Sequence, residues 1–150
     1  TSEYAIKDNL QEEMLRILLK RFIILCTRIA REKFSVSPER EKAFDMVRQF
    51  YVLVDNHFKE KKMVQDYADM LHRSPKTLSN LFTTCGLPSP LRIIHERIEA
   101  EAKRLLLYSQ KSAKEITEIL GFEDQATFSR FFKKMTGESV SEYRKREKRE

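Results

Sequence analysis

The feature that most constrains the fold of this 150-residue chain is an internal repeat with an offset near 50 residues. Residues 77–82 (TLSNLF) align with residues 127–132 (TFSRFF), and residues 67–71 (YADML) align with residues 116–120 (ITEIL). Each copy has the pattern of a short helix, a tight turn and a second helix that begins at a Ser or Asp cap. Because a repeated sequence predicts a repeated structure, we expect two copies of one two-helix unit.

The residues at the turn of each copy favour a helix-turn-helix motif. Two helices that cross steeply over a short turn need a small residue on the first helix and a tolerant backbone in the turn. Ala68 is the small residue in the first copy, and Gly121 is the turn residue in the second copy. Thr117 and His72 stand at the matching positions, where Ala and Gly would fit most easily. The two copies in register support each other.

The composition and the periodicity predict an all-α fold. The chain has only 3 Gly and 4 Pro, and no segment alternates apolar and polar residues as a strand would. We expect two helix-turn-helix subdomains joined by a long connecting helix and preceded by two long N-terminal helices. The predicted helices cover residues 8–32, 38–62, 64–71, 75–85, 90–108, 113–120, 125–135 and 141–148.

The predicted domain boundary lies after residue 62. Residues 1–62 form a helical linker or dimerisation region, with Asn9 as the cap of its first helix. Residues 63–150 form the second domain. Its parts are a first helix-turn-helix unit (63–86), a connecting helix (90–108), a second unit (112–137) and a final helix (139–148).

The first N-terminal helix carries more apolar surface than one covered face needs, and the second has the spacing of a packed helix. The first has a stripe at steps of three and four, which other apolar residues widen. Its members are Leu10, Met14, Leu18, Phe22, Leu25 and Ile29. The second has the spacing of a helix packed lengthwise on another, in a helix pair or a hairpin. Its members are Phe44, Val47, Tyr51, Val54 and Phe58.

The remaining composition excludes several classes of protein. The longest apolar runs are far shorter than the roughly 20 residues of a membrane span, and the first residues show no signal peptide, so we expect a cytoplasmic protein. Cys26 and Cys85 lie in apolar helical pattern, which predicts buried free thiols. Neither the cysteines nor the three histidines have zinc-site spacing, and no catalytic motif appears. We expect no metal, no cofactor and no enzymatic activity.

The charge and the spacing of the two units indicate a polyanionic partner. The net charge is +6, which suits nucleic acid but is also common among proteins that bind none. A connecting helix of about 20 residues spans roughly 30 Å, close to the roughly 34 Å of one B-DNA turn. The second helices of the two units can therefore enter successive major grooves of one duplex, which predicts an asymmetric site.

Residues 62–146 resemble the AraC-type transcription regulators. The matching positions are EAKRLL at 101–106, Ser112, Glu115, Ile116, LGF at 120–122, Asp124, Gln125, FSRFFKK at 128–134, Thr136, Gly137 and SEYR at 141–144. Thr117 and Val140 depart from the pattern, where the family usually has Ala and Pro. The resemblance implies a DNA-binding domain that follows a separate sensing or dimerising region. It also implies double-stranded DNA as a partner and leaves contact with RNA polymerase open. The broad apolar stripe of the first helix, in a region similar to the linker helices that often dimerise such regulators, leads us to expect a homodimer through residues 8–60.

The resemblance also places candidate DNA contacts on the second helix of each unit. In the first unit Leu78, Leu81 and Phe82 are expected in the core, and Asn80 can pair with adenine. In the second unit the three Phe residues are expected in the core, whereas Arg130 could instead fix a neighbouring helix. The candidates are Lys76, Thr77, Ser79, Asn80, Thr83, Gln125, Ala126, Thr127, Ser129, Arg130 and Lys133. Further phosphate candidates are Lys134, Arg144 and Arg146.

Other functions stay open at this stage. The same module can be attached to a DNA-repair methyl acceptor, which needs a reactive Cys in an activated setting that neither cysteine has. A helical interaction module without a DNA role would leave the candidate contacts as ordinary solvated side chains. The sequence indicates neither the operator nor the effector, nor whether target genes are switched on or off.

Overall fold

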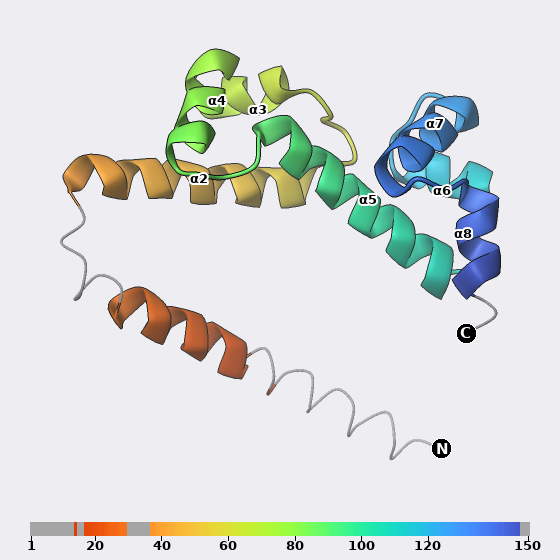
Figure 1. The fold of residues 1–150 in the computed structure, drawn as a ribbon, viewed down its shortest axis with the longest axis horizontal. Coiled ribbons are helices and arrows are strands. Elements are labelled where there is room, and N and C mark those ends of the chain that lie inside the picture. Colours follow the sequence, from red (N-terminus) through yellow and green to blue (C-terminus); the bar gives the residue numbers. More distant parts are fainter. Residues whose placement is uncertain (1–13, 15–16, 30–36, 148–150) are drawn as a thin grey trace. The chain divides into compact units, whose positions relative to one another are not determined.

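The structure is a computed structural model that describes residues 14, 17–29 and 37–147 (Figure 1). The chain forms two compact units, residues 1–41 and residues 42–150. Every element among the described residues is a helix or a turn, which confirms the predicted all-α fold class. None of the helices in these ranges is long and apolar enough to cross a membrane.

The helices from residue 37 onward follow the predicted order. Their bounds are α2 Pro38–His57, α3 Val64–Met70, α4 Pro75–Thr84, α5 Pro90–Tyr108, α6 Ala113–Ile119, α7 Gln125–Thr136 and α8 Val140–Glu147. Helices α3 to α8 begin and end within one residue of the prediction. Helix α2 ends at His57 and not at Lys62, because the amides of Glu60 and Lys61 both bond to the His57 carbonyl and close a turn there.

Side-chain caps explain why these boundaries could be read from the sequence. The Ser74 and Asp124 side chains accept hydrogen bonds from the amides of Thr77 and Thr127, at 3.1 and 2.7 Å. The Ser112 hydroxyl caps α6 by accepting from the Glu115 amide, and the Glu115 carboxylate in return accepts from the Ser112 amide. A cap satisfies backbone groups that a helix start leaves without partners, so the signal is local.

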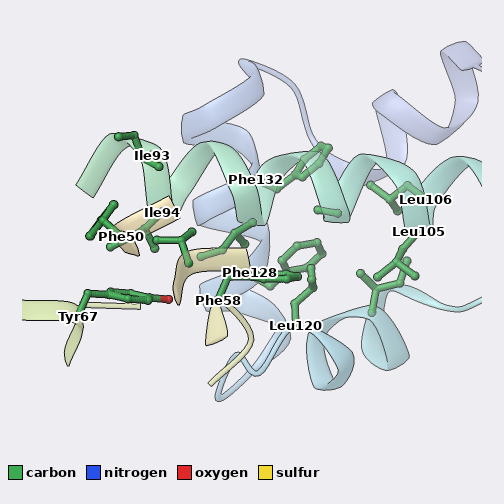
Figure 2. Close-up of a cluster of buried hydrophobic side chains, with 14 of the residues drawn as sticks. Phe50, Phe58, Tyr67, Ile93, Ile94, Leu105, Leu106, Leu120, Phe128 and Phe132 are labelled. Atoms are coloured by element: carbon green, nitrogen blue, oxygen red, sulfur yellow. The ribbon is translucent and has the colours of Figure 1, made fainter. Parts of the chain in front are cut away.

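Helix α5 is the centre of the compact unit 42–150, and both helix-turn-helix pairs pack on it. Its Ile93, Ile94, Ile98, Leu105 and Leu106 are buried in one cluster with side chains of the other helices. Figure 2 shows these side chains gathered along α5, with Phe50 and Tyr67 at one end of the view and Leu120 and Phe128 farther along. One continuous core therefore supports both pairs.

Helix α2 is part of this core. Phe50 is fully buried, with its ring 4.9 Å from Phe82 of α4 and 5.5 Å from Tyr67 of α3. The compact unit therefore starts near residue 42, earlier than the boundary after residue 62. The predicted stripe is also wrong at Phe44 and Tyr51, which are 54% and 40% exposed. The buried face is centred on Phe50 because its partner is the first helix-turn-helix pair and not a parallel helix.

The structure accommodates His72 and Thr117, the two residues that stand where Gly and Ala would fit most easily. His72 has φ +52°, and Gly121 at the matching position has φ +67°. The two turns thus share a left-handed residue, which His adopts at a cost and Gly adopts freely. Thr117 is buried, and its hydroxyl donates to the Ala113 carbonyl at 2.8 Å. The buried polar group is therefore satisfied.

In the compact unit 1–41, residues 17–29 form a helix with an exposed apolar surface. Leu18, Phe22, Leu25 and Ile29 of the predicted stripe are all about half exposed or more within this unit. Cys26 is exposed as well, so the prediction of a buried thiol is wrong there, whereas Cys85 is half-buried. The predicted cap Asn9 and the predicted ends of this helix lie outside the described residues.

Candidate nucleic-acid interface

The first candidate surface is the outer face of α4. Leu78 and Phe82 are fully buried and fix the rotation of this helix. The predicted contact residues are therefore all exposed: Lys76, Thr77, Ser79, Asn80 and Thr83. Thr77 and Thr83 also have local roles, because the Thr77 hydroxyl bonds to the Ser74 cap and the Thr83 hydroxyl donates to the Ser79 carbonyl. Within the described part of the chain, Lys76 and Asn80 make no side-chain hydrogen bond.

The second candidate surface is the outer face of α7, where Phe128 and Phe132 are fully buried. Among the predicted contact residues, the exposed ones are Gln125, Ala126, Arg130 and Lys133, and the half-buried ones are Thr127 and Ser129. The amide of Thr127 donates to the Asp124 carboxylate, and this bond lowers the pKa of Asp124. The cap therefore stays ionised at neutral pH.

Arg130 does not fix a neighbouring helix. Its guanidinium donates to the Thr127 hydroxyl at 3.2 Å, one turn earlier on α7. Its side chain is exposed, so its remaining donors face solvent. The alternative role weighed from the sequence is thus not the one that the structure favours. Arg130 is available to a base or a phosphate, because guanidinium donors suit both.

The two surfaces are equivalent under the 50-residue offset. Lys76, Thr77, Ser79, Asn80 and Thr83 correspond to Ala126, Thr127, Ser129, Arg130 and Lys133. Each set lies opposite a buried pair, Leu78 with Phe82 or Phe128 with Phe132. The side chains differ between the copies, with three of the corresponding positions changed in chemistry. A ligand that contacts both surfaces would therefore meet two different sets of groups.

The basic residues divide into free and occupied ones. Lys133 and Lys134 lie in the last turn of α7, are exposed, and form no hydrogen bond or salt bridge within the described ranges. Arg144 instead donates to the Lys111 carbonyl at 2.6 Å, and Arg146 pairs with Glu138 beside the Tyr143 ring. The structure thus separates two residues that can bind an anion from two that hold α8.

Helix α5 holds the two surfaces apart. It has 19 residues, which at 1.5 Å per residue is about 28 Å. Figure 1 shows the α3–α4 pair and the α6–α7 pair at different positions along α5. On α5, Glu101 is nearly buried and accepts two hydrogen bonds from Arg104, at 2.7 and 3.0 Å. These bonds lower the pKa of Glu101, and the nearby Arg97 adds to the effect.

His95 connects α5 to α7, a contact that no pattern in the sequence indicates. Its ring lies edge-on to Phe131 at 5.3 Å. Burial lowers the pKa of His95, and the charge of Lys134 lowers it further. His95 is therefore neutral near pH 7 and packs as an apolar ring.

No metal-binding cluster appears in the part of the chain that the structure covers. No group of three His, Cys, Asp or Glu residues there could hold a metal ion.

Known proteins match the part of the chain that contains the two helix-turn-helix pairs. A family model described as a helix-turn-helix domain matches residues 67–146, which is more than half of the chain. The uncharacterized HTH-type transcriptional regulator YisR of Bacillus subtilis is 30% identical over 81% of this chain. The matched region is 41% of YisR, so the chain spans less than half the length of this relative.

Solved structures show the same fold. The C-terminal domain of AraT, a response regulator from Geobacillus stearothermophilus, is 29% identical, with a TM-score of 0.61 over 67% of this chain and 84% of that domain. The DNA-binding domain of AdpA, a global transcriptional factor solved with a target DNA, is 23% identical. Its TM-score is 0.55 over 68% of this chain and 88% of that domain, a likeness of fold alone.

Proposed function

The chain belongs to the AraC-type helix-turn-helix family of DNA-binding transcription regulators, and from this premise we propose that α4 and α7 enter successive major grooves of one duplex. The observation that carries the proposal is the pair of equivalent exposed surfaces on α4 and α7, each fixed by a buried pair of side chains. A major groove admits one helix, and the second helix of such a motif is the one that contacts bases.

The length of α5 supports the use of two neighbouring grooves. Its length of about 28 Å is close to the rise of roughly 34 Å for one turn of B-DNA. One chain could then span the two half-sites that simpler regulators reach as a dimer. Because the two surfaces carry different side chains, we expect an asymmetric operator.

The side chains suggest a role for each surface. Asn80 and Gln125 have amides that can pair with adenine, and Ala126 can contact a thymine methyl. Lys76 and Arg130 can pair with guanine or with a phosphate. Lys133 can bind a phosphate. These are proposed contacts, and no catalytic role is part of the proposal.

We propose a homodimer through residues 8–60 as the state of the chain in solution. The support is the exposed stripe of residues 18, 22, 25 and 29, whose steps of four, three and four are those of a helix that pairs with its own copy. Helix α2 contributes at most its exposed side, since its other face is buried. Sedimentation equilibrium tests this: a dimer mass that Leu25→Lys reduces to a monomer is expected, and a monomer at high concentration contradicts it.

The setting of this function follows from the ligand. Because the proposed ligand is double-stranded DNA that carries an operator, we propose that the protein acts in the cytoplasm and meets RNA polymerase where the operator adjoins a promoter. Transcription in vitro from a promoter that carries the selected site would show this contact as a changed transcript level. An unchanged level at saturating protein would contradict it.

Selection of bound fragments from random duplex DNA, followed by titration at several salt concentrations, tests the DNA proposal. We expect one asymmetric consensus and an affinity that falls steeply with salt, because bound lysines and arginines release counterions. Lys133→Ala should reduce the salt slope by about 1 without changing the consensus. Recovery of no consensus, or salt-independent binding, would contradict the proposal.

A further inference from the structure

The turn of the second helix-turn-helix pair touches the loop after α2, 59 residues earlier in the chain. The Lys62 ammonium donates to the Gly121 carbonyl at 2.8 Å and to the Lys59 carbonyl at 2.7 Å. It also lies 5.0 Å from the centre of the Phe122 ring. A Cβ placed on Gly121 would come to 2.0 Å from the Lys59 carbonyl oxygen, so the two backbones are in direct contact.

This contact is continuous with packing toward α7. Phe122 follows Gly121, and its ring lies 5.4 Å from Phe128 and 5.3 Å from Phe131. Both of these residues are on α7, and Phe128 fixes the rotation of that helix. A shift at Gly121 would therefore move the second candidate surface.

On its other side the contact is continuous with packing toward α4. The Tyr67 hydroxyl donates to the carbonyl of Lys61, next to Lys62, at 2.8 Å. The Tyr67 ring packs on Phe50, and Phe50 packs on Phe82 of α4. The loop after α2 thus stands between the two helices that carry the candidate contacts.

The chemistry of Lys62 differs from that of its neighbour. The Lys61 ammonium pairs with the carboxylate of Asp66 at 3.7 Å, so its partner belongs to α3 of the first helix-turn-helix pair. Lys62 forms no salt bridge within the described ranges, and both of its acceptors are backbone carbonyls. Burial lowers the pKa of Lys62, against the opposing effect of Glu60. Its charge is therefore used to hold two carbonyl dipoles together.

The C-terminal end of α2, which precedes Lys62, is bound to α5. Arg97 of α5 donates to Asp55 at 2.7 Å, and its guanidinium lies 4.0 Å from the centre of the Phe58 ring. Phe58 is itself buried. The end of α2 is thus anchored, so that Lys62 projects from a fixed point toward the second turn.

We propose that Lys62 is a positioning residue that fixes the orientation of α7 relative to α4, and so the half-site spacing that the chain accepts. Helix α5 and the continuous core join the two pairs by apolar packing, which sets no unique direction. The bridge from Lys62 to Gly121 adds a hydrogen-bonded connection of defined direction between the two pairs. Its effect on DNA rests on the proposed function, whereas its effect on the protein does not.

The first test measures the distance between α4 and α7 without DNA. Spin labels at Asn80→Cys and Lys133→Cys, in the full chain with Cys26→Ser and Cys85→Ala, report a distance distribution by double electron–electron resonance. We expect Lys62→Met to broaden or shift the distribution and Lys61→Met, which removes the same charge, to leave it unchanged. Lys62→Arg, which keeps a cationic donor, should restore the narrow distribution. Identical distributions for Lys62→Met and Lys61→Met would overturn the proposal.

The second test uses the duplex obtained by selection, with its half-sites moved apart or together by one or two base pairs, and with one half-site scrambled. Lys62→Met should lose about tenfold in affinity for the original duplex relative to Lys61→Met, because preorganisation is lost. The two variants should bind the scrambled duplex equally. Equal losses on every duplex would overturn the proposal. If the unmodified chain does not distinguish the duplexes, the two-groove function fails, and the distance measurement still decides the role of Lys62.

Discussion

Gly121 and Gly86 form a matched pair for testing how closely the second turn approaches α2. Both have φ +67°, so replacement by Ala imposes the same backbone strain at each. That strain is about 1 to 2 kcal/mol for an L-residue, and it is partly offset because Ala has less freedom than Gly in the unfolded chain. Nothing lies within 4 Å of a Cβ at Gly86. We therefore expect Gly86→Ala to lower the free energy of unfolding by about 1 kcal/mol.

At Gly121 the same change adds a collision. The new Cβ would lie 2.0 Å from the Lys59 carbonyl oxygen, which is 1.4 Å inside an ordinary contact of 3.4 Å. The turn must move away by about that distance, which breaks the 2.8 Å bond from Lys62 to the Gly121 carbonyl. A hydrogen bond from a charged donor contributes about 1.5 to 3 kcal/mol. We expect Gly121→Ala to lower the free energy of unfolding by about 2.5 to 4 kcal/mol in total.

Urea unfolding followed by far-ultraviolet circular dichroism measures both variants under the same conditions. The difference between them isolates the contact, because the backbone strain cancels. A difference of about 1.5 to 3 kcal/mol is expected. Equal losses, within about 0.5 kcal/mol, would refute the close approach of the turn to Lys59.

Three further predictions concern single side chains. Gln125→Ala and Arg130→Ala should each weaken binding to the selected duplex by about 1 to 3 kcal/mol in titrations while leaving unfolding unchanged, and full affinity in both variants would remove them from the interface. His72→Gly should raise the free energy of unfolding by up to about 1 kcal/mol in urea, because it relieves φ +52°; a loss would show that the His ring contributes packing. Tyr67→Phe should cost about 1 kcal/mol at pH 7, because the Lys61 carbonyl loses its donor. Burial raises the pKa of Tyr67 to about 12 from 10.0, so its contribution is complete below pH 10 and is lost as the pH rises toward 12. Between pH 10 and pH 12 the free energy of unfolding should therefore fall less in Tyr67→Phe than in the unmodified chain. Equal decreases in the two proteins would contradict this.

The sequence was sufficient for the helices of the two repeats because their signals are local. Caps such as Ser74 and Asp124, and the left-handed turn residues at 72 and 121, act within a few residues of the position that they define. The outward faces of α4 and α7 could be predicted for a similar reason. Buried residues at 78, 82, 128 and 132 fix the rotation of each helix by their periodicity.

The role of α2 could not be predicted because it depends on a distant partner. Its sequence contains two overlapping apolar patterns, one with Tyr51 and one with Phe50, and periodicity alone does not choose between them. The choice is made by Tyr67 and Phe82, which close over Phe50. The contact of Lys62 with Gly121 could not be predicted either. The positive φ of the turn is by itself a sufficient reason for a glycine at 121, so the sequence contains no sign that a second backbone lies close to it.

If one chain contacts two successive major grooves on one face of a duplex, its contacts with guanine N7 must fall in two places on the selected duplex. Methylation interference locates these contacts, because modification of guanine N7 blocks binding in the major groove. We expect two patches of interference centred about 10 base pairs apart, with Lys76→Ala affecting one and Arg130→Ala the other. A single patch, or two patches half a turn apart on opposite faces, would contradict this.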